Sequence, residues 1–298
     1  MTNFDATADL LDMHEDYRVL RRIGKSETWG LKHKSTEVRQ AVFVDVETTG
    51  LDIDNDEIIE IGIVPFNYDL GTGEIIWVDE DDALSQFRDP GVPIPGETTK
   101  IHGITDDMVR GRSIDEDKLN QLVSAANLII SHNSAFDRPM VERVFPIFRE
   151  KPWACSLTDI DWRDEGFGAG KLDYLLMQFG YFYEGHRALN DCLAGTFLLN
   201  QILPNSGKRV MATLLSNARK PLFAIRAIDS PFEAKDKLRS RGYRWDPGSD
   251  VTEKAWWIIV PNAQTELAWL KENIYQGEVN LPVKEITALN RFSKRIWT

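Results

Sequence analysis

Apolar residues gather in short runs that alternate with helical patterns along most of the chain. The run 41–47 is rich in β-branched residues and predicts a buried strand. A second run, 127–132, predicts another strand, and an apolar stripe with four-residue spacing at 135–145 predicts a helix after it. Further strands are expected near 57–67, 74–78 and 153–157, and further helices near 114–126, 172–179 and 187–203. Together these patterns favour an α/β or α+β fold.

The two ends of the chain have patterns of their own. The first 38 residues predict an N-terminal helical extension, whose helix begins near Leu10 and ends near Gly24. Strands are expected at 222–228 and 255–260, and helices at 231–241 and 262–274. The expected division of the chain is an extension at 1–38, a main domain at 39–205, a linker helix at 206–218 and a small, basic, Trp-rich α+β domain at 219–298.

Composition describes an ordinary globular chain. Of the 298 residues 42% are apolar, and since no apolar run reaches about 18 residues, no membrane span is expected. The N-terminus lacks the basic-then-apolar pattern of a secretory signal. The two cysteines form no disulfide framework or zinc-ligand pattern. A cytoplasmic location is expected.

The net charge of −12 is unevenly divided. Residues 1–218 hold 21 Lys and Arg against 37 Asp and Glu, which gives −16, whereas residues 219–298 hold 14 against 10, which gives +4. An acidic main domain argues against a broad electrostatic groove for nucleic acid. Bound metal ions would offset part of that charge, and phosphate attraction is expected to come partly from the tail.

Two carboxylates lie on the first expected strand. Asp45 and Glu47 project from the same side because strand side chains alternate, while Val44 and Val46 point into a core. Neighbouring carboxylates on a core strand repel each other and lose hydration, so they need a cation or shared protons. The plain alternative is an acidic strand end that reaches solvent, and an isolated D-x-E pattern favours that alternative.

A third carboxylate, Asp137, follows the second strand. It falls in the first turn of the helix expected at 135–145, near the carboxyl end of a strand, where open α/β sheets bind their ligands. Taken alone, this position is better explained by the preference of carboxylates for helix N-termini.

His186 and Asp191 form the last candidate pair. Asp191 lies on a helix that packs against the sheet, since Leu189, Cys192 and Leu193 follow helical spacing. Five residues on a helix would separate the two side chains by roughly 140°, so His186 is expected on the loop before the helix. A mobile histidine beside a metal cluster suits a general base. A solvent-exposed loop histidine without function is an equal alternative.

Four carboxylates and a histidine in this order are what two-metal phosphodiester cleavage requires. The segments 45–51, 132–137 and 186–191 match, in order, the Exo I, Exo II and Exo III motifs of the DEDDh 3′→5′ exonucleases. The chain resembles this family over roughly residues 39–205, and within it is most similar to the proofreading epsilon subunit of bacterial DNA polymerase III and its stand-alone relatives. The segments 57–62 (EIIEIG) and 101–105 (IHGIT) add to the resemblance.

The resemblance implies an RNase H-like fold, with a mixed sheet of about five strands flanked by helices. It implies that Asp45, Glu47, Asp137, His186 and Asp191 are catalytic, with the four carboxylates as ligands of two divalent cations and His186 as the base. Oxygen ligands and phosphate favour Mg²⁺ or Mn²⁺. The implied activity is removal of nucleoside 5′-monophosphates from DNA 3′ ends, in proofreading, repair or DNA turnover.

Four further positions are implied in nucleotide binding: Thr48, Leu51, His102 and Asn133. Leu51 and His102 match positions that flank the terminal nucleotide in relatives. For both, ordinary packing in a core is an equal alternative.

The tail carries candidates for stacking on single-stranded bases. Tyr243, Trp245 and Trp257 stand among basic residues, an arrangement typical of proteins that bind single strands. A domain of about 60 residues also needs large aromatic side chains to fill its core. Because strand side chains alternate, Trp256 and Trp257 are not expected to point inward together.

Two other functions stay open at this point. The first is a 3′→5′ exoribonuclease of the same superfamily, with RNA in place of DNA. The second is a non-catalytic accessory subunit of a polymerase or of DNA, although a complete set of five catalytic residues speaks against it. The expected partner is DNA, as single strands or 3′ ends. Neither protein partners nor the oligomeric state follow from the sequence.

Overall fold

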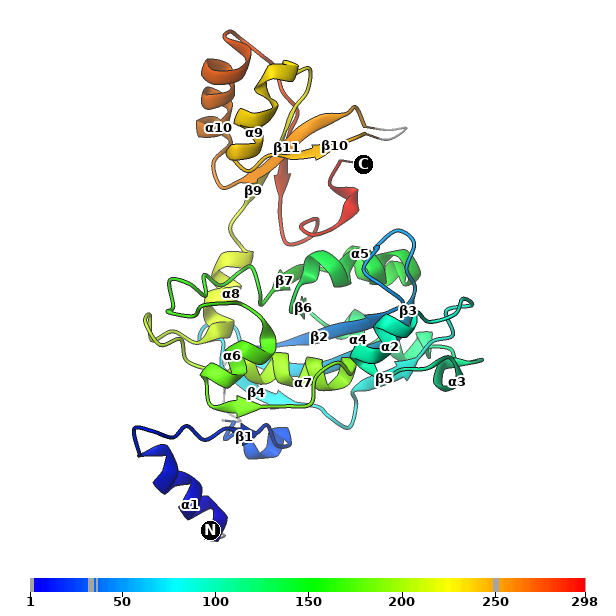
Figure 1. Ribbon diagram of the computed structural model, residues 1–298, viewed down its shortest axis with the longest axis vertical. Helices are drawn as coiled ribbons and strands as arrows, with labels where there is room; N and C mark the ends of the chain where they lie inside the picture. Colours follow the sequence, from blue (N-terminus) through cyan, green and yellow to red (C-terminus); the bar gives the residue numbers. More distant parts are fainter. Residues whose placement is uncertain (1–2, 32–34, 36, 249–251, 298) are drawn as a thin grey trace. The chain divides into compact units, whose positions relative to one another are not determined.

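The computed structural model describes residues 3–31, 35, 37–248 and 252–297 (Figure 1). The chain divides into two compact units, Met1–Asn217 and Ala218–Thr298. Within the described residues, none of the helices combines the length and apolar character that crossing a bilayer requires.

The first unit is built on a six-stranded mixed sheet. Its order is β4-β3-β2-β6-β7, with β5 also paired to β3. The long central strands β2 and β3 are antiparallel, while β6 runs parallel to both β2 and β7. The strands are β2 Val38–Thr48, β3 Ile58–Asp69, β4 Ile75–Val78, β5 Leu84–Phe87, β6 Leu128–Ser131 and β7 Trp153–Cys155.

Helices cover this sheet on both sides. Helix α7 packs against β2 and β3 on one face, and α5 lies over the other face (Figure 1). This arrangement confirms the expected α/β class. The helices are α2 Gly96–His102, α3 Asp106–Val109, α4 Glu116–Ala125, α5 Ser134–Val144, α6 Leu172–Gln178, α7 Ala188–Leu199 and α8 Val210–Ala218.

Two glycines allow α7 to lie unusually close to the sheet. A Cβ on Gly195 would lie 2.1 Å from the ring of Phe43 on β2, and a Cβ on Gly62 of β3 would lie 2.5 Å from the backbone of Ala188. Gly62 is also the register partner of Asp45. The first turn of α7 is therefore seated directly beside the part of the sheet that carries Asp45.

The N-terminal segment differs from the expected helical extension over 1–38. Helix α1 Asn3–Asp12 ends twelve residues earlier than predicted, because Asp12 accepts a hydrogen bond from the Val19 amide (3.1 Å) and pairs with Arg21 (3.2 Å). The chain then forms strand β1 Arg21–Arg22, parallel to β8 Tyr181–Phe182, and a 3₁₀ turn at Ser26–Thr28. The segment thus supports the loop that leads to His186.

The helix expected as a linker at 206–218 is a packed part of the first unit. Val210, Met211 and Leu214 of α8 are completely buried. A Cβ on Gly73, in the turn between β3 and β4, would lie 2.5 Å from the backbone of Ala212. Close packing of this kind leaves α8 no freedom to act as a hinge.

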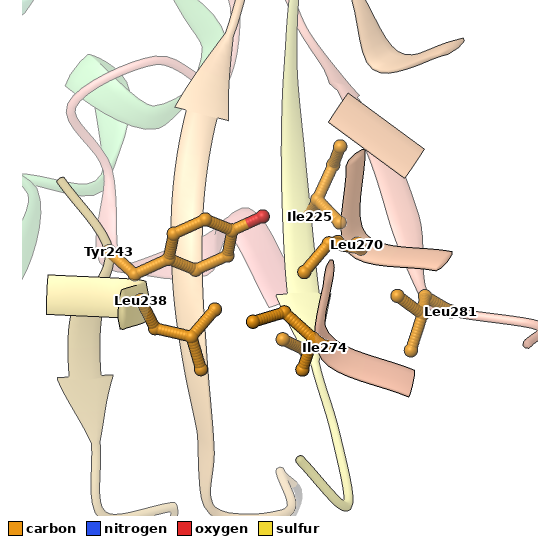
Figure 2. Close-up of a cluster of buried hydrophobic side chains, with 7 residues drawn as sticks. Ile225, Leu238, Tyr243, Leu270, Ile274 and Leu281 are labelled. Carbon is orange, nitrogen blue, oxygen red and sulfur yellow. The ribbon is translucent and has the colours of Figure 1, made fainter. Parts of the chain in front are cut away.

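The second unit is the small α+β domain expected from the sequence. Its antiparallel sheet has the order β10-β11-β9-β12, and helices α9 and α10 enclose a core with Ile225, Leu238 and Tyr243 (Figure 2). The elements are β9 Leu222–Ala227, α9 Lys235–Ser240, β10 Arg244–Asp246, β11 Ala255–Val260, α10 Ala263–Leu270, continued by a π-helix at Lys271–Tyr275, and β12 Val283–Ile286. Short 3₁₀ turns at Phe232–Ala234 and Lys294–Trp297 complete it.

Candidate catalytic site

Three of the predicted carboxylates meet at one point in the first unit. One carboxylate oxygen from each of Asp45, Glu47 and Asp191 lies within 4.8 Å of the other two. Asp45 and Glu47 project from the same face of β2, as the alternation of side chains requires. Asp191 comes from the first turn of α7, on the face of the sheet that this helix covers. Residues almost 150 positions apart thus form one group that could hold a metal ion.

Asp137 approaches the same group from another element. It lies in the first turn of α5, is only 4% exposed, and its negative charge raises the pKa of Asp45. It is not one of the three mutually close carboxylates. The site therefore consists of three mutually close carboxylates and a fourth, Asp137, beside them.

Burial raises the pKa of every carboxyl group in the site. It raises the pKa of Asp45 well above the usual range, with further contributions from the charges of Asp137, Asp191 and Glu47. Burial and the charge of Asp191 raise the pKa of Glu47 to about 8, and burial raises that of Asp137 to about 7. Such groups become fully ionised at neutral pH only when a cation balances them.

His186 lies on the loop before α7, as expected. Its backbone has a positive φ of 62°, which is uncommon for a residue with a side chain and often marks a functional position. Burial raises the pKa of Asp191, while the electrostatic interaction with His186 and the His186 backbone amide act to lower it. The imidazole is therefore next to the carboxylates and exposed to solvent.

A buried ion pair fixes the segment that follows His186. Glu60 on β3 is 1% exposed and binds the Arg187 guanidinium through both oxygens, at 2.8 and 3.1 Å. The same carboxylate accepts the Ala188 amide at 3.2 Å. Glu60 is the register partner of Glu47. This pair joins the start of α7 to the strand beside Glu47, and the sequence showed Glu60 only as part of a resemblance.

Tyr183 is a second residue that sequence reasoning missed. Its hydroxyl donates to Oδ1 of Asp191 at 2.7 Å, and the Arg187 amide donates to Oδ2 at 3.1 Å. Burial and the charge of Asp191 raise the pKa of Tyr183, so the hydroxyl keeps its proton and remains a donor. Two donors thus orient the carboxylate of Asp191. No periodicity in the sequence indicates such a contact, because Tyr183 lies in an irregular loop after β8.

Three of the predicted nucleotide-binding residues lie on the segments that carry the carboxylates, just after Glu47 and just before α5. Leu51 is 85% exposed, which rules out the alternative that it packs in a core. Thr48 donates its hydroxyl to the Gly50 carbonyl at 2.5 Å, so it shapes the loop that carries Leu51. Asn133 stands at the N-cap of α5 with a φ of 135° and its side chain makes no capping hydrogen bond.

His102, the fourth, is buried with one ring nitrogen unsatisfied. Nδ1 accepts the Ile104 amide at 3.0 Å, so in the neutral ring the proton sits on Nε2. Among the described residues no partner reaches this buried Nε2. Its pKa is lowered by burial and by the charges of His186 and Arg187, so His186 lies nearby. A buried donor without a partner costs about 1–3 kcal/mol, a cost that a bound ligand would offset.

The three stacking candidates of the tail lie in different surroundings. Tyr243 is 3% exposed and donates its hydroxyl to Glu266 at 2.9 Å (Figure 2). The prediction that it stacks on DNA is therefore wrong, because its ring fills the core. Trp257 is half-buried on one face of β11, opposite Arg244 and Arg226. Trp245 is half exposed on β10 and is the register partner of Trp256.

Comparison with known proteins places this geometry in context. The chain matches the model of a family described as exonuclease over residues 42–197. The PolC-type DNA polymerase III of Clostridium perfringens (strain 13 / Type A) is 34% identical over 113 residues, which are 37% of this chain and 7% of that protein. The DNA polymerase III subunit epsilon of Treponema pallidum (strain Nichols) is 26% identical over 181 residues, which are 55% of this chain and 77% of that protein. The chain thus spans only a small part of the PolC-type relatives.

One solved structure, described as exonuclease X in complex with 5′ overhanging duplex DNA, is 25% identical. The alignment covers 59% of this chain and 99% of that chain, with a TM-score of 0.43.

The Tyr183 hydrogen bond can be tested by a single-atom change. Tyr183→Phe removes one of the two donors to Asp191, and we expect affinity for Mn²⁺ to fall by about 10- to 100-fold, as when outer partners of ligands are removed. Titration calorimetry measures this affinity. Tyr181→Phe is the matched control, because its ring packs on Phe197 at 4.6 Å. Equal affinities of the two variants would show that the hydroxyl does not orient Asp191.

The raised pKa values predict how stability depends on pH. Without divalent cations the folded protein holds protons that the unfolded chain releases, so stability falls as the pH rises from about 4 to about 8. A divalent cation displaces these protons, so Mg²⁺ should raise the melting temperature far more at pH 8.5 than at pH 5.5. Thermal unfolding in EDTA and in Mg²⁺ measures this. A Mg²⁺ effect that does not depend on pH would contradict the assignment.

Proposed function

The chain belongs to the exonuclease family, in its DEDDh 3′→5′ branch, and on that premise we propose that it removes nucleoside 5′-monophosphates from DNA 3′ ends. The observation that carries the proposal is the meeting of Asp45, Glu47 and Asp191 within 4.8 Å, with Asp137 and His186 beside them. These five residues are the complete set that the resemblance assigns to catalysis. A non-catalytic accessory role would not explain why the fold keeps these carboxyl groups buried together, which lowers its stability when they are ionised.

The names of the relatives support DNA as the substrate. The PolC-type protein and the epsilon subunit both belong to DNA polymerase III. Since the chain spans only 7% of the PolC-type protein, a role in replication does not transfer with the likeness. We assign it to proofreading, repair or turnover of DNA as a class, in the cytoplasm.

The carboxylates fit a pair of hard divalent cations. The donor set consists of oxygen atoms alone, and burial keeps the acids partly protonated until a cation arrives. Asp45, Glu47 and Asp191 would hold the ions, together with Asp137 beside them. When bound, Mg²⁺ or Mn²⁺ ions would activate the attacking water and stabilise the charge on the phosphate and the leaving 3′-oxygen.

The remaining residues orient the reactants and move the proton. His186, exposed on its loop beside Asp191, would accept the proton of the attacking water. The Glu60–Arg187 pair would hold that loop against β3. Leu51 offers an exposed apolar side chain to the terminal base, while Thr48 and Asn133 border the same position.

Removal of one negative charge tests the catalytic assignment. Asp45→Asn or Asp191→Asn should lower the cleavage rate by about a thousandfold or more, because each loses several kcal/mol of charge stabilisation. Melting temperatures should not fall, since the substitution relieves repulsion. Asp107→Asn, whose carboxylate is 82% exposed, is the control.

The assay uses 5′-labelled single-stranded DNA and RNA of one sequence, with Mg²⁺ and then with EDTA. A metal-dependent ladder that shortens from the 3′ end, faster on DNA, supports the proposal. A ladder on RNA alone would replace DNA by RNA as the substrate. Absence of cleavage under both Mg²⁺ and Mn²⁺ would overturn the enzymatic function itself.

The unpaired nitrogen of His102 predicts a role in substrate binding. His102→Asn keeps an acceptor for the Ile104 amide but removes Nε2. We expect KM for single-stranded DNA to rise about tenfold, which corresponds to one lost hydrogen bond to a buried donor, with a smaller change in kcat. An unchanged KM would indicate that Nε2 does not contact the nucleotide.

A further inference from the structure

Aromatic and basic side chains lie next to one another along one edge of the second unit. Phe232 is 75% exposed, and the Lys235 ammonium lies 4.3 Å from the centre of its ring. The Arg239 guanidinium lies 5.8 Å from the ring of Trp256, which contacts Trp245 edge-to-face at 5.6 Å. These five residues are called the aromatic–basic strip below.

The elements of the fold make this strip continuous. Lys235 and Arg239 are four residues apart on α9 and therefore share one face of that helix. Trp245 and Trp256 are register partners on β10 and β11, and β10 is the edge strand of the sheet. The strip thus runs from the 3₁₀ turn before α9, along the helix, to the edge of the sheet.

Exposure distinguishes Phe232 and Trp245 from the aromatic side chains that pack on the core of the same unit, Trp256 among them. A domain of this size needs buried rings, and Tyr243 meets that need (Figure 2). Trp245 is 50% exposed, so packing in the core does not explain why the exposed half of its side chain is aromatic. A single exposed ring is ordinary on a protein surface, but rings that lie together with cations along one edge indicate a binding surface.

The positive charge of the second unit indicates which kind of partner the strip would bind. Residues 219–298 carry a net charge of +4, against −16 for residues 1–218. Among the residues that the structure describes, the ion pair of Arg239 is with Asp236, at 3.8 Å, and both side chains are highly exposed, so the pair is weak. Rings and cations along one edge match a single nucleic-acid strand, whose bases stack on aromatic faces while its phosphates meet basic groups.

We propose that the aromatic–basic strip of the second unit binds single-stranded nucleic acid, with bases stacked on Phe232 and Trp245 and phosphates at Lys235 and Arg239. Stacking is available to every base, so binding should tolerate any sequence. This inference deepens the proposed exonuclease function, because a second binding surface retains the strand that the first unit shortens.

The test uses the full-length chain with Asp45→Asn, so that binding is measured without cleavage. Fluorescence anisotropy with labelled (dT)20 should show binding about tenfold weaker for Trp245→Ala and for Phe232→Ala. Trp77→Ala, an equally exposed tryptophan of the first unit, should bind like the parent. Trp245→Phe retains a ring and should recover most of the affinity.

The arginine of the strip has a closely matched control. Arg239→Ala should weaken binding and reduce the slope of log affinity against log salt by about 0.7, the value for one phosphate contact on a single strand. Arg110→Ala removes an arginine that, like Arg239, pairs with an aspartate three residues before it. It should leave both quantities unchanged.

Three ligands, namely (dT)20, (rU)20 and a 20-base-pair duplex, distinguish the possible outcomes of the binding test. Equal losses on (dT)20 and (rU)20, with no loss on a 20-base-pair duplex, support a general single-strand surface, while a loss on (dT)20 alone narrows it to DNA. Affinity of Trp245→Ala equal to that of Trp77→Ala, with both proteins folded by thermal melting, would overturn the proposal. Because Asp45→Asn cannot cleave, this result is independent of whether the parent enzyme proves to be an exonuclease.

Discussion

The repulsion between carboxylates packed into one place is the constraint on which the first unit depends. Burial and mutual repulsion raise the pKa of Asp45, Glu47 and Asp137, so these groups oppose the fold when they are ionised. The rest of the unit must supply enough packing energy to keep them together. The completely buried apolar residues of β2 and β3 provide this rigid platform. Strain kept at a site in this way is what pre-organises it for a cation.

Helix α7 links the carboxylates to the rest of the unit, because it carries Asp191 and packs against β2 and β3. Gly62 and Gly195 let the helix approach the sheet closely, and the Glu60–Arg187 pair fixes its first turn. The position of Asp191 therefore depends on three contacts between α7 and the sheet, namely those at Gly62, at Gly195 and at the Glu60–Arg187 pair. The loop with His186 is held from one side by this pair and from the other by β1 and β8, which support the residues before it. The N-terminal segment thus contributes to the site without containing any part of it.

Sequence patterns predicted the long, periodic elements, and they singled out the three carboxylates that the fold brings together, Asp45, Glu47 and Asp191. Asp45 and Glu47 follow from strand alternation, and His186 was correctly placed on a loop because five residues do not match a helical repeat. Short elements such as α3 and β5 were missed, since four residues carry no measurable period. The predicted helix after Leu10 failed for a different reason: Asp12 binds Val19 and Arg21, and the segment that follows pairs as β1 with β8, which is distant in sequence.

Residues that act through others were the hardest to predict. Tyr183 and Arg187 have no special spacing, and their roles exist only once α7 and β3 are packed. A signal for Glu60 was nevertheless present, because a single acid within the apolar run 58–64 must find a partner when the strand is buried. Tyr243 of the tail is the opposite case. The sequence suggested an exposed ring, but the ring is buried and its hydroxyl donates to Glu266 in the core.

The division of charge between the two units follows from the chemistry of the first. A site that gathers acids to bind cations cannot also attract a polyanion over a wide surface, so its own residues discourage the substrate at long range. With the strand binding proposed for the second unit, a separate basic unit resolves this conflict, because it would attract a strand without placing positive groups where they would compete with the metal ions. Had the basic residues been placed around Asp45 and Glu47, they would have paired with the carboxylates, as Arg187 already does with Glu60. An acidic first unit joined to a basic second unit is therefore a consistent arrangement for an enzyme that cleaves a polyanion with bound cations.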